Sequence, residues 1–154
     1  QTLQALASLA GQTELPEQVV VVENGSFLPA RDLPPQPWPL DILRNEHNLG
    51  YTTALNQAFR RTTAPFVLLL NPDVQLSPNY LAEGVAFLEA HADFGAVTGK
   101  LYMSDWRRLD STGIFWHRNW RPYDRGQMEM DRGQYDTPGE VFAACGAAAL
   151  LRRA

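Results

Sequence analysis

The sequence predicts an α/β fold built on a mostly parallel β-sheet. Two short apolar runs, residues 18–23 and 66–70, have the length and composition of strands buried on both faces. Segments whose apolar residues recur at helical spacing precede and follow these runs. This alternation of helix and strand is typical of a parallel sheet with right-handed crossover connections.

The first residues predict one helix and one strand. Residues 1–10 carry apolar side chains at helical spacing, and Gly11 fits the end of that helix. The β-branched run Val19–Val22 predicts a buried strand. Asn24–Ser26 is a turn signature that ends this strand.

A loop, a short strand and a second helix are expected next. Residues 27–39 hold five of the eleven prolines and predict an irregular connection. Residues 41–44 fit a short strand, and the apolar stripe within residues 51–62 predicts a helix. The strand at residues 66–70 follows.

The second half is less regular. Ser77 and Pro78 are a good N-cap and first helical residue, and the apolar pattern of this third helix reaches Ala92. Residues 94–103 predict a strand. Residues 105–138 match no element, and the end of the chain, around Leu150–Leu151, fits a strand or a helix end equally well.

Composition limits the function classes. A chain of 154 residues fits one domain with a real core. A net charge of -4 and a pI of about 5.3 argue against a nucleic-acid binder, which usually carries a basic stripe. Arginines gather only in pairs, which we expect to be solvated surface. The pairs are 60–61, 107–108 and 152–153.

Cysteine usage and hydropathy bear on location. Cys145 is the single cysteine, which excludes an intrachain disulfide and a cysteine-built zinc site and favours a reducing compartment. No apolar stretch approaches the roughly 20 residues that span a bilayer, and the N-terminus does not resemble a signal peptide. We expect a cytoplasmic protein, and peripheral attachment to the inner face of the membrane stays open.

Polar loops follow the three best strand predictions, at residues 23–26, 45–50 and 71–73. The carboxyl ends of parallel strands meet at one edge of a sheet, where open α/β sheets bind their ligands. Glu23 and Asn24 suit the hydrogen-bonding groups of a nucleoside. The other two loops offer Gly50 at a helix entrance, for phosphate, and Asp73, for Mg²⁺ or Mn²⁺.

Each of these signals has a simpler explanation when it is taken alone. Asn24–Gly25 is a common turn sequence, and Asn48 could cap the following helix. Residues 71–73 could form an Asx-type turn. The order and expected convergence of the loops favour a binding site.

The order of these motifs resembles the family 2 glycosyltransferases of the GT-A fold, in particular their rhamnosyltransferase-like branch. The resemblance covers nearly the whole chain and is most specific in residues 48–56 followed by Asn71-Pro72-Asp73. The motifs that carry it are residues 3–6, 20–26, 48–51, 54–56, 70–74, 131–136, 146–148 and 152–153.

The resemblance implies a role for each matching position. Glu23 stands where the family usually has an aspartate that contacts the nucleoside, in the same loop as Asn24 and Ser26. Asn48 and Gly50 would lie beside the nucleotide. Asn71-Pro72-Asp73 matches the family's metal motif, so that Asp73 would hold Mg²⁺ or Mn²⁺ and Asn71 would be a weaker, neutral ligand. Residues 146–147 would approach the acceptor.

The resemblance also implies the reaction, an inverting transfer of a hexose or deoxyhexose such as rhamnose. The donor would be a nucleotide-diphospho-sugar, and the acceptor a hydroxyl of a glycan or lipid-linked glycan. Residues 1–103 would form the nucleotide-binding part and residues 104–154 the start of the acceptor-side part. We expect a preceding first strand before Gln1 and a catalytic base beyond Ala154, so these residues would be an internal piece of a larger enzyme. An uncovered sheet edge would favour a homo-oligomer.

Two alternatives stay open. A sugar-nucleotidyltransferase would use a related sheet, and a non-catalytic binding or interaction module would need no base. The tryptophans of residues 105–138, namely Trp106, Trp116 and Trp120, suit either sugar stacking or the packing of a loop over the core. For Asp131 and Asp136 we expect solvated loop carboxylates.

Overall fold

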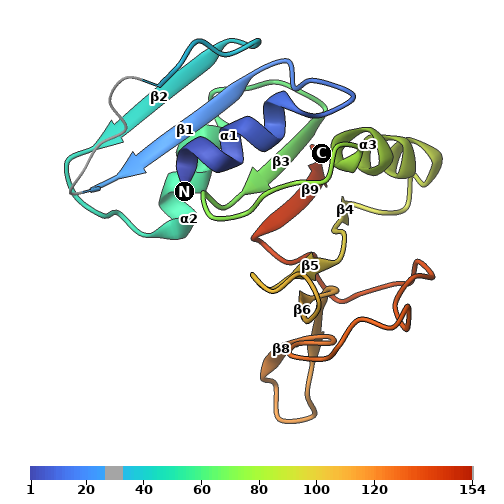
Figure 1. The fold of residues 1–154 in the computed structure, drawn as a ribbon. Coiled ribbons are helices and arrows are strands. Elements are labelled where there is room, and N and C mark those ends of the chain that lie inside the picture. Colours follow the sequence, from blue (N-terminus) through green and yellow to red (C-terminus); the bar gives the residue numbers. More distant parts are fainter. Residues whose placement is uncertain (27–32, 154) are drawn as a thin grey trace. The chain divides into compact units, whose positions relative to one another are not determined.

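The computed structural model describes residues 1–26 and 33–153, and it confirms a mixed α/β chain (Figure 1). The helices are α1 (Thr2–Ala10), α2 (Tyr51–Phe59) and α3 (Tyr80–Ala90). The strands are β1 (Val19–Asn24), β2 (Leu40–Asn45), β3 (Phe66–Leu70), β4 (Ala96–Val97), β5 (Leu101–Tyr102), β6 (Leu109–Ser111), β7 (Ile114–Trp116), β8 (Pro122–Asp124) and β9 (Ala148–Arg152). The loop expected at residues 27–39 can be compared only over residues 33–39, because residues 27–32 lie outside the described residues.

The described residues divide into two compact units. The first unit comprises residues 1–67, 72–83 and 153, apart from the residues not described. The second unit comprises residues 68–71 and 84–152. The boundary passes through β3 and α3, so each of these elements contributes to both units.

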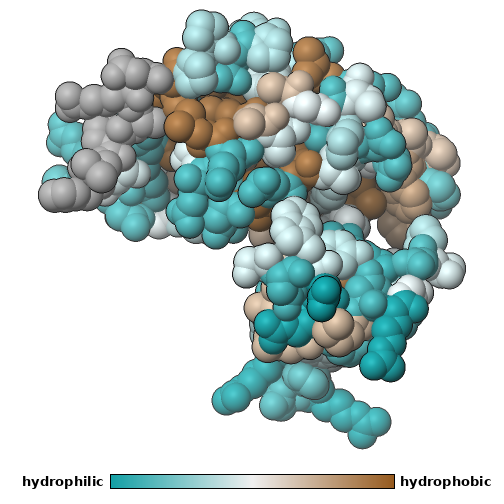
Figure 2. All heavy atoms as spheres, viewed as in Figure 1, coloured by the Kyte–Doolittle hydropathy of each residue, from teal (hydrophilic) through white to brown (hydrophobic). Residues whose placement is uncertain are grey.

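The first unit is built on the parallel pair of β1 and β2. The strands are in register from Val19 opposite Leu40 to Asn24 opposite Asn45. β-branched valines fill β1, as expected for a strand, and α2 packs against it. The four valines are only half-buried, and Figure 2 shows hydrophobic atoms at the surface of this part of the molecule.

Helix α1 is joined to the start of α3 by the buried side chain of Gln12. Its amide nitrogen donates to the carbonyl oxygen of Ser77 at 2.7 Å, and its amide oxygen accepts from the backbone nitrogen of Leu81 at 3.0 Å. Because a buried amide needs partners for its donors and its acceptor, these bonds make the contact specific.

The second unit contains the three-stranded sheet β3–β9–β4 and two small hairpins, β5–β6 and β7–β8. A Cβ added at Gly84 of α3 would lie 2.9 Å from the end of the Leu150 side chain, which would have to shift to accept a larger residue. Leu88, one turn further along α3, has no exposed surface.

The expectation of a mostly parallel sheet is not confirmed. β1 and β2 pair in parallel, whereas β4–β9, β5–β6 and β7–β8 are antiparallel pairs. The sequence argument treated every strand as part of one sheet, although several later strands are only two or three residues long.

Residues 94–103 do not form the single strand that the sequence predicts. They form β4 and β5, which pair with different partners, β9 and β6. Between them the Thr98 hydroxyl donates to the Ala148 carbonyl oxygen at 3.0 Å. A side chain that bonds to the neighbouring strand in this way competes with a continuous ladder.

Two further boundaries differ from the sequence prediction. Helix α3 spans Tyr80–Ala90. It begins later than the sequence predicts, because Ser77 and Pro78 form the turn before the helix. Residues 105–138, which match no pattern, contain β6, β7 and β8. Their short strands are too brief for a period to be read from the sequence.

Arg152 and Arg153 are not the solvated pair that we expected. Both are half-buried, and each binds carbonyl oxygens at the end of a different helix. Arg152 donates to Leu88 at the end of α3. Arg153 donates to Phe59 at 2.9 Å and to Thr62 at 2.8 Å, beyond α2. Helix C-termini leave carbonyls without partners and favour cations, which explains both positions.

Replacing Arg153 by lysine should destabilise the protein. Lysine has a single ammonium group and cannot reproduce the three bonds of the guanidinium to Phe59, Thr62 and Ala64. We expect the free energy of unfolding to fall by about 1–3 kcal/mol. Thermal and chemical denaturation would measure this loss.

Arg60→Lys is the matched control, because Arg60 lies at the same helix end and is exposed. Its free energy of unfolding should change by less than about 0.5 kcal/mol. Equal losses in the two variants would contradict the role given to the Arg153 guanidinium.

Candidate nucleotide-binding site

The loops after β1 and β2 come together, as the sequence predicts. Gly25 has a φ of 71°, in the left-handed region, and a Cβ at this position would lie 2.4 Å from the backbone nitrogen of Asn48. Only glycine can occupy this position. The turn at residues 24–26 therefore lies directly against the loop at residues 47–48.

The Asn24 side chain joins these loops through four hydrogen bonds. Its amide nitrogen donates to Asn48 Oδ1 at 3.0 Å and to the Gly50 carbonyl oxygen at 3.2 Å. Its amide oxygen accepts from Asn45 Nδ2 and from the Leu49 backbone nitrogen, both at 3.0 Å. An amide has two donors and two acceptor positions, so all four are used within the chain.

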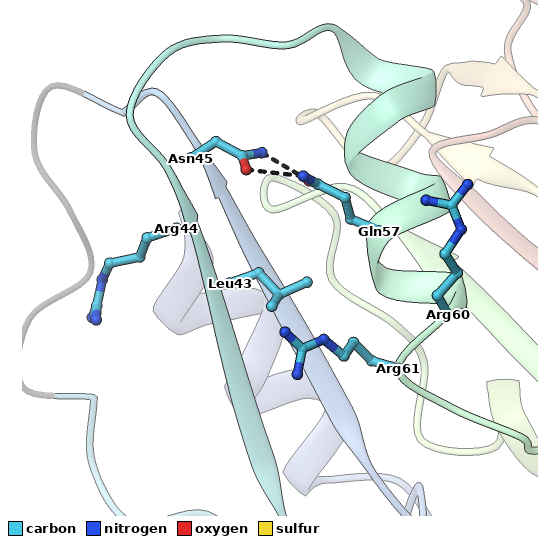
Figure 3. Close-up of a pocket in the computed structure, with 6 residues that line it drawn as sticks. All are labelled: Leu43, Arg44, Asn45, Gln57, Arg60 and Arg61. Carbon is cyan, nitrogen blue, oxygen red and sulfur yellow. Dashed lines mark hydrogen bonds between the residues drawn. The ribbon is translucent and has the colours of Figure 1, made fainter.

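Behind Asn24, Asn45 and Gln57 form a reciprocal pair. Asn45 Nδ2 donates to Gln57 Oε1 at 2.8 Å, and Gln57 Nε2 donates to Asn45 Oδ1 at 3.0 Å (Figure 3). The three side chains, Gln57, Asn45 and Asn24, thus form a chain of hydrogen bonds from α2 to the loop at residues 48–50. We call it the amide chain.

The amide chain borders a pocket of about 250 Å³. Its lining residues are Leu43, Arg44, Asn45, Gln57, Arg60 and Arg61. Arg60 and Arg61 follow the end of α2, where cations stabilise the helix dipole, so their presence has a structural explanation.

Glu23 is buried and paired with its cross-strand neighbour. The Arg44 Nε atom donates to Glu23 Oε2 at 2.7 Å, and the side chains are 59% and 8% exposed respectively. The guanidinium of Arg44 balances the charge of the buried carboxylate. A nucleoside contact by Glu23 would have to share the carboxylate with Arg44.

Gly50 begins α2 in a conformation open to a ligand. Its φ is 86°, and among the described residues no atom other than those of its chain neighbours lies within 4 Å of the position where a Cβ would stand. Its backbone nitrogen donates to Asn48 Oδ1 at 2.9 Å. The free space lies at a helix N-terminus, the end that favours anions. Ser26, also predicted for this site, is exposed in the neighbouring turn.

Asn71 and Asp73 follow β3. The Asn71 backbone nitrogen donates to the Ala147 carbonyl oxygen at 2.9 Å, within the second unit. Asp73 lies in the turn after Pro72, belongs to the first unit and is exposed. Its carboxylate makes no hydrogen bond or ion pair with another described residue.

Asp73 fits a hard cation that the substrate itself helps to hold. Among residues 1–26 and 33–153, no three histidine, cysteine or acidic side chains gather into a metal-binding group. Mg²⁺ is commonly bound by one or two carboxylates together with substrate phosphates and water. A single exposed carboxylate with no competing partner matches that mode of binding.

Asp131 and Asp136, expected to be solvated, bind Lys100 in the second unit. The Lys100 ammonium donates to both oxygens of Asp131 at 3.1 Å and also to Asp136. Hydrogen bonds from Tyr102, from the Gly133 backbone and from Lys100 lower the pKa of Asp131 to about 2. The pKa of Lys100 is raised, chiefly by Asp136. The cluster ties β5 to the turn at residues 131–136.

A parallel strand pair with converging polar loops and a helix N-terminus at its carboxyl end is an arrangement that α/β proteins commonly use to bind ligands. Comparison with protein families identifies the chain further, because the model of glycosyl transferase family 2 matches residues 2–154. The chain belongs to this family. Its membership implies a nucleotide-sugar donor and a glycan acceptor, and favours sugar transfer over nucleotidyl transfer.

A search of curated proteins gave no match. None of the helices in the described part of the chain is long and apolar enough to cross a membrane.

Sequence reasoning missed Gln57 and the ion pair between Glu23 and Arg44. Gln57 is one of several polar residues of α2, with Thr52, Thr53 and Asn56, so no signal in the sequence sets it apart. Arg44 is matched to Glu23 only through the register of β1 and β2, which the sequence analysis did not predict.

Replacing Gln57 by leucine should weaken donor binding without unfolding the protein. The change removes both bonds to Asn45, so that Asn24 and the loop at residues 48–50 lose their support from α2. We expect the KM for the nucleotide-sugar donor to rise about tenfold, with a smaller change in kcat. Steady-state kinetics of the complete protein would measure both constants.

Arg60→Gln is the control, because Arg60 lines the same pocket but is not part of the amide chain. Its KM should stay within about twofold of the original value. A Gln57→Leu variant with an unchanged donor KM would contradict the role of the amide chain.

The lowered pKa of Asp131 predicts how stability depends on pH. The ordinary value in an unfolded chain is about 3.9, so the ionised carboxylate stabilises the folded state above about pH 4. This contribution is lost as the pH falls from about 4 to 2. Asp131→Asn should therefore flatten the decline of the melting temperature in that range, whereas Asp93→Asn, a change in an exposed turn, should leave the decline as it is.

Proposed function

We propose that this chain binds a nucleotide-diphospho-sugar in its first unit and serves the inverting transfer of the sugar to an acceptor hydroxyl. The observation that carries this proposal is the family match over residues 2–154. The convergence of the β1 and β2 loops supports it. A hexose or deoxyhexose, with rhamnose as the first candidate, is the sugar that the rhamnosyltransferase-like motifs favour.

In this proposal the nucleoside lies beside Glu23 and Asn48, and the diphosphate lies near Gly50 at the start of α2. Open space at Gly50 and the helix N-terminus suit an anion. Asn24 serves by holding the loop, because its amide groups are already used. Ser26 is a further candidate for a nucleotide contact.

We assign Asp73 as the protein carboxylate that holds Mg²⁺ or Mn²⁺, with Asn71 as a weaker, neutral candidate. A divalent ion neutralises charge that develops on a leaving diphosphate. The role of Asp73 is to keep such an ion at the end of β3.

Residues 1–103 would supply donor binding and residues 104–154 the beginning of the acceptor side, which would take a glycan or lipid-linked glycan. The second unit begins at residue 84 and also includes residues 68–71, so its bounds do not coincide with this division. We assign no general base among the described residues.

Asp73→Ala tests the metal assignment. In the complete protein it should abolish the Mn²⁺-dependent part of nucleoside diphosphate binding, because no other protein carboxylate is assigned to the ion. Isothermal calorimetry with nucleoside diphosphates, with and without Mn²⁺, would measure the effect. We expect the affinity in the presence of Mn²⁺ to fall by about 10- to 100-fold.

Asp93→Asn changes an exposed carboxylate elsewhere and should leave binding unaltered. Metal-dependent binding that survives in Asp73→Ala would contradict the assignment.

A product assay tests the reaction itself, since sugar transfer releases a nucleoside diphosphate whereas nucleotidyl transfer releases pyrophosphate. Pyrophosphate as the product would contradict the proposed function.

A further inference from the structure

Residues 117–121 form the tip of the β7–β8 hairpin, and we call them the hairpin tip. The His117 backbone nitrogen donates to the Arg121 carbonyl oxygen, and the Trp120 nitrogen donates to the His117 carbonyl oxygen, both at 2.9 Å. Asn119 Oδ1 accepts from the Arg121 nitrogen at 3.2 Å. These bonds define the conformation of the tip.

The conformation of Trp120 is unfavourable for a tryptophan. Its φ is 63°, in the left-handed region where turns of this kind usually carry glycine or asparagine. Its side chain is nevertheless 83% exposed, so it adds little to the core. Folding alone would favour glycine at this position.

The hairpin tip is also positively charged. Arg118 and Arg121 are exposed on either side of Trp120, and residues 117–123 contain no acidic side chain. In Figure 2 hydrophilic side chains extend from the end of this hairpin. The whole chain carries a net charge of -4, so the tip has the opposite sign to the rest of the protein.

We propose that the hairpin tip docks on an anionic phospholipid surface. Tryptophan prefers the boundary between water and lipid, where its ring is buried and its N–H stays hydrated. Arginines beside it bind lipid phosphates and gain energy from the negative surface potential. A neutral glycan would make no use of the two cations, and a nucleic-acid binder usually carries a longer basic stripe than this tip offers. This inference does not depend on the proposed sugar transfer.

Trp106 offers a matched comparison within the same chain. Its nitrogen donates to the Met103 carbonyl oxygen at 2.9 Å, its φ is 56°, and its side chain is 67% exposed. Its turn therefore has the same form as the hairpin tip. It differs in charge, because Asp105 lies beside Trp106 and accepts from Arg108 Nε at 2.6 Å.

Vesicle co-sedimentation of the complete protein tests the proposal. Vesicles of phosphatidylcholine with phosphatidylglycerol should bind it, and vesicles of phosphatidylcholine alone should bind it far less. Arg118→Gln and Arg121→Gln should each lower the coefficient for partition of the protein onto these vesicles by about fivefold. Binding should fall as salt rises, because the tip is exposed.

Trp120→Gly separates membrane binding from folding. Glycine relieves the left-handed strain, so the melting temperature should stay equal or rise while vesicle binding is lost. Trp106→Ala should bind vesicles like the unchanged protein.

Three results would overturn the proposal. One is equal binding to both kinds of vesicle, and another is an equal loss of binding in Trp106→Ala and Trp120→Gly. The third is binding of a single-stranded oligonucleotide that is as tight as vesicle binding and is lost in the same variants, since the tip would then recognise polyanions in general.

Discussion

The candidate site depends on the side-chain amide of Asn24. Its two donors and its acceptor oxygen bind four groups, which come from β2, the loop after it and the start of α2. Residues 46–50 are all exposed, so these hydrogen bonds supply the order that burial supplies elsewhere. Asn24 therefore belongs to the framework of the site, and space for a ligand is left beyond it, at Gly50.

The elements with a clear period could be predicted from the sequence. The valine run of β1, the apolar run of β3 and the stripes of α1 and α2 each match a strand or a helix in the structure. Prediction failed where strands have two or three residues, as in β4, β5 and β6, because no period can develop over that length. It also failed where a polar side chain has a tertiary role, since Arg152 and Arg153 look like surface charges until their helices are in place.

The site could be predicted only in outline. The sequence predicted that the loops at residues 23–26 and 45–50 lie at one edge of the sheet, and the close approach at Gly25 shows that they are in contact. Their contacts differ from the expected ones, because Glu23 is paired with Arg44 and Asn24 has used its hydrogen-bonding groups. Such pairings depend on strand register, which residue types alone do not reveal. Ligand contacts and the metal-binding role of Asp73 stay predictions.

Arg152, which ends β9, and Arg153, which follows it, limit how the length of this strand can change. Arg152 binds the end of α3 within the second unit, and Arg153 binds the end of α2 within the first. Inserting or deleting one residue before them would shift both guanidinium groups away from these carbonyl oxygens and uncap both helices together. Evolution can vary the apolar residues of this strand, but an odd change in its length would be tolerated far less readily than a substitution.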